Sequence, residues 1–165
     1  MDNNDGCRAS SADLREYQEV QALVENLYND NNKSAYESLK QLEKKSEEGS
    51  VVYLFMDSFA RMLEDENSYI RNRGILLIAA NAKWDEDNKI DEIIDEYLRH
   101  IMDIKPITAR QCIKCLPRIA MYKKNLRGDI AAALKRADPQ RYPGSMSPLV
   151  QKDIEESLKK IAKYK

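Results

Sequence analysis

Two arginines and a pair of cysteines are the residues of this 165-residue chain whose types and spacing could do chemistry. Arg71 and Arg73 lead directly into an apolar run, and a guanidinium is well suited to hold a phosphate. Cys112 and Cys115 form a C-x-x-C pair, a spacing used both in disulfide exchange and in zinc binding. Whether either pair acts on a ligand depends on the elements that position it.

The cysteine pair lies in the wrong place for reactive chemistry. A redox pair needs a cysteine at the N-terminus of a helix, where the dipole lowers its pKa, but the helix is expected to begin at Pro106. A structural zinc site needs four ligands, and only Cys7 and His100 remain as candidates. The cysteines are therefore predicted to be small buried residues, with no metal and no cofactor bound.

The other titratable side chains give no positive support for an enzyme. Asp85, Glu86 and Asp87 are expected to solvate a loop and cap the helix that follows it. His100 falls in the last turn of a helix, with no nucleophile at a suggestive spacing. Trp84 is predicted to seal a seam between helices, with stacking on a ligand as the alternative. The chain contains no phosphate-binding glycine loop and no H-E-x-x-H motif, so the sequence predicts a protein without catalytic activity.

Composition favours a single helical domain with an uneven charge distribution. Charged residues make up 33% and apolar residues 42% of the chain, and Gly and Pro number only five each. Residues 105–165 hold 15 Lys or Arg against 5 Asp or Glu, whereas residues 1–104 hold 12 against 23. Such an asymmetry is a hint of an interaction surface.

The sequence also predicts a cytoplasmic protein that does not enter a membrane. No stretch reaches the roughly 18 consecutive apolar residues that a bilayer span requires. The N-terminus lacks the plan of a secretory signal, and three cysteines argue against a disulfide framework.

Hydrophobic residues recur at helical spacing along most of the chain. Residues 1–12 are predicted to be a disordered tail because they offer little apolar surface, with Ser10 or Ser11 as the N-cap of the first helix. Residues 13–165 are predicted to be one all-α domain of eight helical segments. The segment at 106–120 repeats at 148–162, with a proline at the expected start of each helix.

At this level the chain resembles a HEAT repeat protein. The resemblance rests on a turn aspartate followed by a β-branched residue and an arginine, as in Asp65, Ile70 and Arg71, and then on apolar residues at helical spacing. It implies a right-handed α-solenoid of about four helical hairpins, with the second helix of each hairpin on the concave face. It also implies a structural ladder in which helix arginines pair with turn aspartates of neighbouring repeats, here Asp65, Arg71, Asp103 and Arg110.

The basic residues near the C-terminus are the candidate binding site. Arg110, Lys114 and Arg118 recur every fourth residue and so form one stripe along a helix. Further cations follow on the last helix, and the full candidate set is Arg110, Lys114, Arg118, Lys152, Lys159 and Lys160. The alternative is that these residues are a solvated charged face.

We therefore expect a binding or scaffold module that takes a protein or peptide, an acidic one by charge complementarity. The opposite charges of the two halves also suggest head-to-tail self-association. A second hypothesis is nucleic-acid binding through the basic half, as in helical-repeat DNA-repair glycosylases, although one Trp and no mapped catalytic Asp weaken that analogy.

Overall fold

The chain folds into α-helices joined by short turns, as seen in a computed structural model that describes residues 9–165. Within that range there is no β-strand, and the prediction of an all-α protein is confirmed. Eight α-helices are present in the described range: α1 (Ser11–Asn26), α2 (Asn32–Glu48), α3 (Met56–Met62), α4 (Ser68–Ala80), α5 (Lys89–Arg99), α6 (Pro106–Tyr122), α7 (Arg127–Arg136) and α8 (Ser147–Ala162). None of the helices described is long and apolar enough to cross a bilayer.

Local sequence signals set several helix starts. Ser10 and Asp13 form a capping box, in which each side chain accepts a hydrogen bond from the backbone N–H of the other. Pro106 occupies the first turn of α6, where its missing N–H leaves no hydrogen bond unmade. Helix α1 begins at Ser11, two residues before the predicted start of the folded domain at residue 13. Residues 1–8 of that tail lie outside the described part of the chain.

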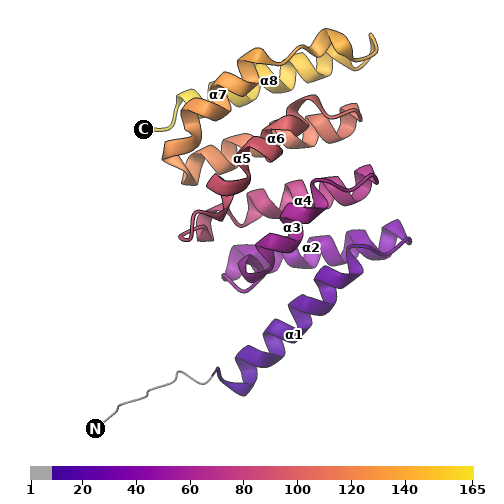
Figure 1. Cartoon of the computed structure of the whole chain (residues 1–165), viewed down its shortest axis with the longest axis vertical. Helices are drawn as coiled ribbons and strands as arrows, with labels where there is room; N and C mark the ends of the chain where they lie inside the picture. The colour runs from indigo at the N-terminus through magenta and orange to yellow at the C-terminus, as the bar shows by residue number, and fades with distance from the viewer. Residues whose placement is uncertain (1–8) are drawn as a thin grey trace.

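The helices form two layers (Figure 1). Helices α2, α4, α6 and α8 stack in chain order, each in contact with the next, and make the first layer. Helices α1, α3, α5 and α7 lie across them and make the second layer. Successive helices of the first layer are neighbours in space although more than 30 residues of sequence separate equivalent positions. In the orientation of Figure 1 the chain climbs from α1 to α8, and α1 is inclined to the other helices.

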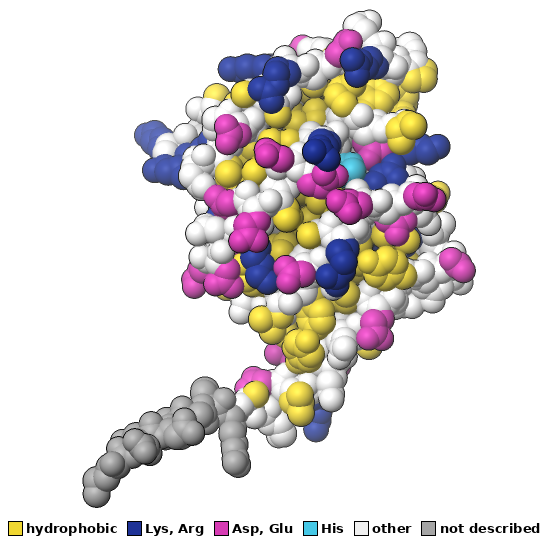
Figure 2. Space-filling model, in the orientation of Figure 1, with side chains coloured by type: hydrophobic (Ala, Val, Ile, Leu, Met, Phe, Trp, Pro, Cys, Tyr) yellow, Lys and Arg dark blue, Asp and Glu magenta, His cyan; other side chains and the backbone are white. Residues whose placement is uncertain are grey.

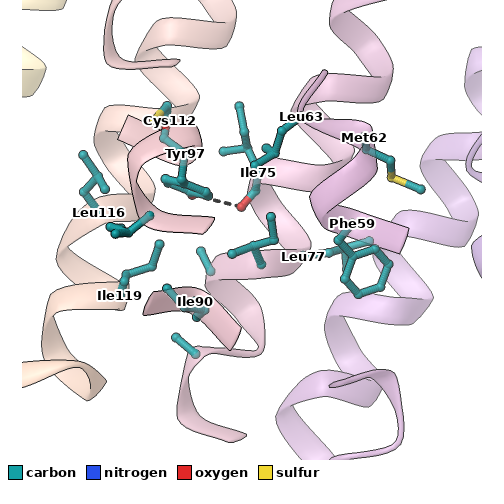
Figure 3. Close-up of a cluster of buried hydrophobic side chains, with 14 of the residues drawn as sticks. Phe59, Met62, Leu63, Ile75, Leu77, Ile90, Tyr97, Cys112, Leu116 and Ile119 are labelled. Carbon is teal, nitrogen blue, oxygen red and sulfur yellow. Dashed lines mark hydrogen bonds between the residues drawn. The ribbon is translucent and has the colours of Figure 1, made fainter. Parts of the chain in front are cut away.

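The core lies between the two layers (Figure 3). Phe59 of α3, Leu77 of α4, Ile90 of α5 and Leu116 of α6 belong to one cluster, and all four side chains are fully buried. The hydroxyl of Tyr97 donates a hydrogen bond of 3.0 Å to the carbonyl oxygen of Ile75, which satisfies the one polar atom of this fully buried ring.

Helices α3 and α4 approach so closely at Gly74 that no side chain fits between them. A Cβ atom placed on Gly74 would lie 2.8 Å from the Cβ of Met62 and 2.8 Å from the carbonyl oxygen of Phe59. The glycine in the run that follows Arg71 and Arg73 is therefore required by packing.

Candidate partner-binding face

The outer side of the layer formed by α2, α4, α6 and α8, named here the even-helix face, carries exposed apolar side chains near the start of each helix. Tyr36 is 56% exposed, Tyr69 57% and Ile107 67%, and Leu149 on α8 is also exposed. These residues precede or interrupt the buried stripe of their helices, so helix–helix packing does not cover them. One exposed apolar residue per helix gives a partner several points of contact along the stack.

The middle of this face is basic, whereas α2 and α8 at its two ends contain acids and bases in equal numbers. Helices α4 and α6 contain five Arg or Lys residues between them and no Asp or Glu. In the opposite layer, α1 and α5 are acidic, with eight Asp or Glu against three Lys or Arg, whereas α7 is basic. The view in Figure 2 looks onto α1, α3, α5 and α7, and Asp and Glu side chains gather across the middle of it. The sequence asymmetry between halves is thus accompanied by an asymmetry between layers, which the linear sequence did not reveal.

Arg71 has an architectural role. Its guanidinium forms a bidentate pair with Asp103, with Nε–Oδ2 and Nη2–Oδ1 distances of 2.9 and 2.8 Å, and both side chains are buried. Its Nη1 donates to the carbonyl oxygens of Asp65 and Glu66 at 2.9 Å. Asp65 therefore takes part in the predicted ladder through its backbone, while its carboxylate accepts a hydrogen bond from the backbone N–H of Asn67.

Asp103 connects several elements at once. Besides Arg71, its carboxylate bonds to His100 Nδ1 at 2.7 Å and to the backbone N–H of Lys105 at 2.8 Å. Burial alone raises the pKa of this carboxyl, but the hydrogen bonds from His100 and Arg71 outweigh burial and hold the pKa well below its usual range. The backbone carbonyl of Asp103 also accepts a bond from the Tyr142 hydroxyl.

Arg110 departs from the predicted ladder. It contacts neither Asp103 nor Asp65 but pairs with Asp153 on α8, with an Nε–Oδ2 distance of 2.5 Å. Lys114 Nζ lies 4.0 Å from the same carboxylate, which is only 4% exposed. Two of the three cations of the predicted α6 stripe thus share a buried counter-ion, and only Arg118 stands apart from it. Asp153 was missed because no local pattern distinguishes it from Glu155 and Glu156, the other acids of α8.

The predicted cations of α8, Lys152, Lys159 and Lys160, are all exposed, and Lys152 and Lys159 lie on the same side of the helix because they are seven residues apart. Lys152 lies 3.9 Å from Glu156. Lys159 also lines a shallow hollow together with Ala131 and Lys135 of α7.

A cavity of about 400 Å³ opens on the even-helix face between α2, α4 and α6, and we call it the α2–α4–α6 cavity. No acidic residue of the described chain lines it. Its lining consists of two cations, two exposed tyrosines, three amides and two leucines: Lys33, Arg73, Tyr36, Tyr69, Asn32, Asn72, Gln111, Leu39 and Leu76. It is within the size range of sites that bind small groups or side chains.

Arg73 differs from Arg71 because it has no acidic partner. Its Nη1 donates to the carbonyl oxygen of Leu27 at 2.6 Å and its Nη2 to Oδ1 of Asn32 at 3.0 Å. The side chain is 5% exposed, yet within residues 9–165 no carboxylate oxygen lies within 4.0 Å of its guanidinium. Burial lowers its pKa, since nearby charge does little to favour the cation.

A second buried charge cluster was not predicted. Lys123 Nζ lies 3.1 Å from Asp85 and 2.7 Å from Asp91, and the Tyr53 hydroxyl donates to Asp85 at 2.7 Å. Asp85 also accepts bonds from the first backbone N–H groups of α5, so the predicted capping role is observed, whereas the predicted solvation of Asp85 is wrong because the residue is buried.

Two other side chains singled out from the sequence occupy structural positions. The indole N–H of Trp84 donates to the carbonyl oxygen of Ser46 at 2.7 Å and so links the segment after α4 to α2. Burial raises the pKa of the Cys112 thiol well above its ordinary value and that of Cys115 to about 11. Such thiols are poor nucleophiles and poor metal ligands. In residues 9–165 no group of three His, Cys, Asp or Glu side chains is placed to hold a metal ion.

A comparison with models of protein families and a comparison with curated sequences each gave no match.

Proposed function

We propose that this protein is a short, right-handed HEAT-like α-solenoid that acts as a non-catalytic binding module. The partner we propose is a protein with an acidic segment, bound along the even-helix face. The observation that supports this most is that α4 and α6, in the middle of that face, bear only positive charges beside exposed aromatic and aliphatic side chains. The order in which the helices stack supports the solenoid interpretation.

Binding would draw on two separate contributions. Exposed cations such as Lys114 and Lys160 would attract an acidic segment and raise its rate of association, while the acidic helices α1 and α5 of the opposite layer would repel it and so direct it to one face. Exposed Tyr36, Tyr69 and Ile107 would then supply contact area that becomes buried in the complex. Tyrosine is enriched at the energetic centres of interfaces because it combines a large apolar ring with a hydrogen-bonding group.

The nucleic-acid alternative has weaker support. A phosphate backbone would need a continuous row of free cations, whereas Arg110 is paired with Asp153 and the lysines of α8 are interrupted by Glu155 and Glu156. Trp84, the aromatic residue considered for stacking, donates its indole N–H to Ser46 and is partly buried. A titration with duplex DNA at low and moderate salt separates the two hypotheses, because phosphate binding falls steeply as salt rises.

The test of the proposal uses two variants that change the net charge equally. Lys114→Glu/Lys160→Glu reverses two exposed cations of the even-helix face, and Lys124→Glu/Lys135→Glu reverses two exposed cations that do not belong to it. Arg110 is left unchanged because its loss would strand Asp153 in the interior.

A partner is first captured on the wild-type protein, identified by mass spectrometry and purified, and its dissociation constant is then measured for each variant. We expect the first variant to weaken binding about tenfold or more, which is about 1.4 kcal/mol, and the second to leave it within about twofold. Equal effects of the two variants on the dissociation constant would show that the partner does not bind through the even-helix face.

A further inference from the structure

We infer that the α2–α4–α6 cavity is a receptor site for a peptide carboxylate, which anchors the acidic partner to the even-helix face. This inference rests on the proposed function and gives it a chemical class of ligand and a position. It depends on three features of the cavity: an uncompensated buried cation, an unpaired buried amide oxygen, and two exposed tyrosines at the rim.

The buried cation is Arg73. An arginine remains charged in a folded protein, and burying a charge without a counter-ion is costly. The two hydrogen bonds observed use two of the five N–H donors of the guanidinium, and both acceptors are neutral. A carboxylate is the natural acceptor for the remaining donors, since charge-assisted bonds to carboxylates are stronger than bonds to neutral groups. Lys33, which lines the same cavity, adds a second positive charge.

The unpaired oxygen distinguishes a peptide from a free anion. Oδ1 of Asn72 is buried and accepts no hydrogen bond within the described structure. A carboxylate has no proton to donate to it, but the backbone N–H groups on either side of a carboxylate-bearing residue do. An unsatisfied buried acceptor costs about 1–3 kcal/mol, so filling it favours a ligand that brings an N–H. Gln111 from α6 offers a further amide to the same ligand.

The tyrosines suit the chain that carries the carboxylate. Tyr36 and Tyr69 stand on adjacent helices, are each more than half exposed, and both line the cavity. Leu39 and Leu76 add an apolar surface to the lining. Aromatic rings beside a cationic cavity give an extended peptide an apolar surface to lie on while its acid enters. A phosphate would offer three strong acceptors to a site that has one arginine, whereas phosphate recognition usually employs several.

The experiment observes backbone amide resonances of the isotope-labelled full chain by NMR during titration with small probes. N-acetyl-leucyl-glutamyl-amide carries a side-chain carboxylate, and N-acetyl-leucine carries a terminal one. N-acetyl-leucyl-glutaminyl-amide is the neutral control of nearly the same shape as the glutamyl probe. Inorganic phosphate tests whether charge alone is sufficient.

We expect the glutamyl probe to shift the resonances of Tyr36, Tyr69, Asn72 and Gln111 with a dissociation constant of about 1 mM, and the glutaminyl probe to bind at least about tenfold more weakly. If N-acetyl-leucine binds more tightly than the glutamyl probe, the site reads a chain end; the opposite order assigns it to Asp or Glu side chains. Either order supports the inference.

Three results would overturn it. The first is that the glutamyl and glutaminyl probes shift the same resonances equally. The second is that phosphate binds as tightly as the glutamyl probe. The third is that no resonance around the cavity responds at about 10 mM probe.

Matched variants of exposed residues check the position without risk to the fold. Lys33→Glu and Tyr69→Ala should each weaken the glutamyl probe at least about threefold, whereas Lys44→Glu, the same charge change on an exposed lysine of the same helix outside the cavity, should have little effect. If Lys44→Glu weakens the probe as much as Lys33→Glu does, the cavity is not the site.

The outcome is separable from that of the proposed function. If the probes fail while partner binding still depends on Lys114 and Lys160, the face binds a partner without this anchor. If the probes bind and the partner ignores Lys114 and Lys160, the cavity serves another ligand and the proposed function fails.

Discussion

Replacing Arg71 by methionine is expected to lower the free energy of unfolding by about 3–5 kcal/mol, because the change leaves a buried carboxylate without its bidentate partner. Asp103 is 6% exposed, so water cannot replace the two bonds from Arg71. The loss also frees the carbonyl oxygens of Asp65 and Glu66. Methionine keeps most of the apolar stem and isolates the charge as the cause.

The same substitution at Arg73 provides an internal comparison on the same helix. Arg73 is buried to a similar extent, but it donates to a backbone carbonyl and an amide oxygen and has no ion pair. Its removal costs hydrogen bonds and strands no buried charge, so we expect a loss of about 1–3 kcal/mol. The two neighbouring arginines of one apolar run should therefore differ clearly in their effects.

The assay is urea unfolding followed by circular dichroism, with the free energy obtained by linear extrapolation. Because a domain has only about 5–15 kcal/mol of stability, Arg71→Lys is a milder second variant, which keeps a positive charge and loses the bidentate geometry. In a double-mutant cycle, Arg71→Met and Asp103→Asn should couple by about 1–3 kcal/mol. Additive effects, or an Arg71→Met cost no greater than that of Arg73→Met, would refute the reasoning.

Three further predictions concern packing, acid stability and thiol reactivity. Gly74→Ala should destabilise the protein by about 1–3 kcal/mol because its Cβ would collide with α3. Gly128→Ala, whose Cβ meets nothing within 4 Å, should be neutral or stabilise the protein by up to about 1 kcal/mol. Thermal melting of both variants tests this, and equal shifts of the melting temperature would contradict the prediction. Because the pKa of Asp103 is depressed, its contribution to stability is present above the ordinary carboxyl pKa of about 4 and is lost as the pH falls toward the folded-state pKa. The urea midpoint should therefore fall more between about pH 6 and pH 2 in the wild type than in Asp103→Asn. Parallel curves of midpoint against pH for the two proteins would argue against this role of Asp103. In a Cys7→Ser background, the Cys115 thiol, whose pKa is about 11, should react with a disulfide reagent at about pH 8 about 100-fold more slowly than an exposed cysteine does. Unfolding in urea should restore the ordinary rate. A fast reaction of the folded protein would show that the thiol is not shielded.

The helices could be predicted from the sequence because their determinants are local. Apolar spacing, the Ser10 cap and the helix-starting Pro106 act within one or two turns, and the structure places helices where these signals stand. One part of the ladder, Arg71 with Asp103, was among the predicted possibilities. The partner of Arg110 could not be chosen, because several aspartates lie at comparable distances along the sequence and only packing selects Asp153.

The candidate site was less accessible to prediction because three helices assemble it. Tyr36, Tyr69 and Gln111 stand more than 30 residues apart in sequence and meet only after α2, α4 and α6 have stacked. A signal was nevertheless present: Tyr36 and Tyr69 are large rings at positions outside the buried stripe of their helices, where packing does not require them. The sequence analysis relied on net charge instead and placed the candidate site in the basic C-terminal half.

Net charge alone is a poor guide to a binding site, because some cations already pair with a buried acid. Lys123 belongs to the basic half but pairs with Asp85 and Asp91 of the acidic half. Part of the charge difference between the two halves is therefore neutralised by ion pairs within the molecule. Arg110 is likewise held by Asp153. A paired, buried cation fixes how helices meet and has little left to offer a ligand, whereas a buried cation with neutral acceptors alone is still in need of an anion. By this criterion Arg73, which the resemblance assigned no role in binding, is a better candidate to receive a partner than Arg110, and the anionic partner should be sought nearer to the middle of the stack than to its C-terminal end.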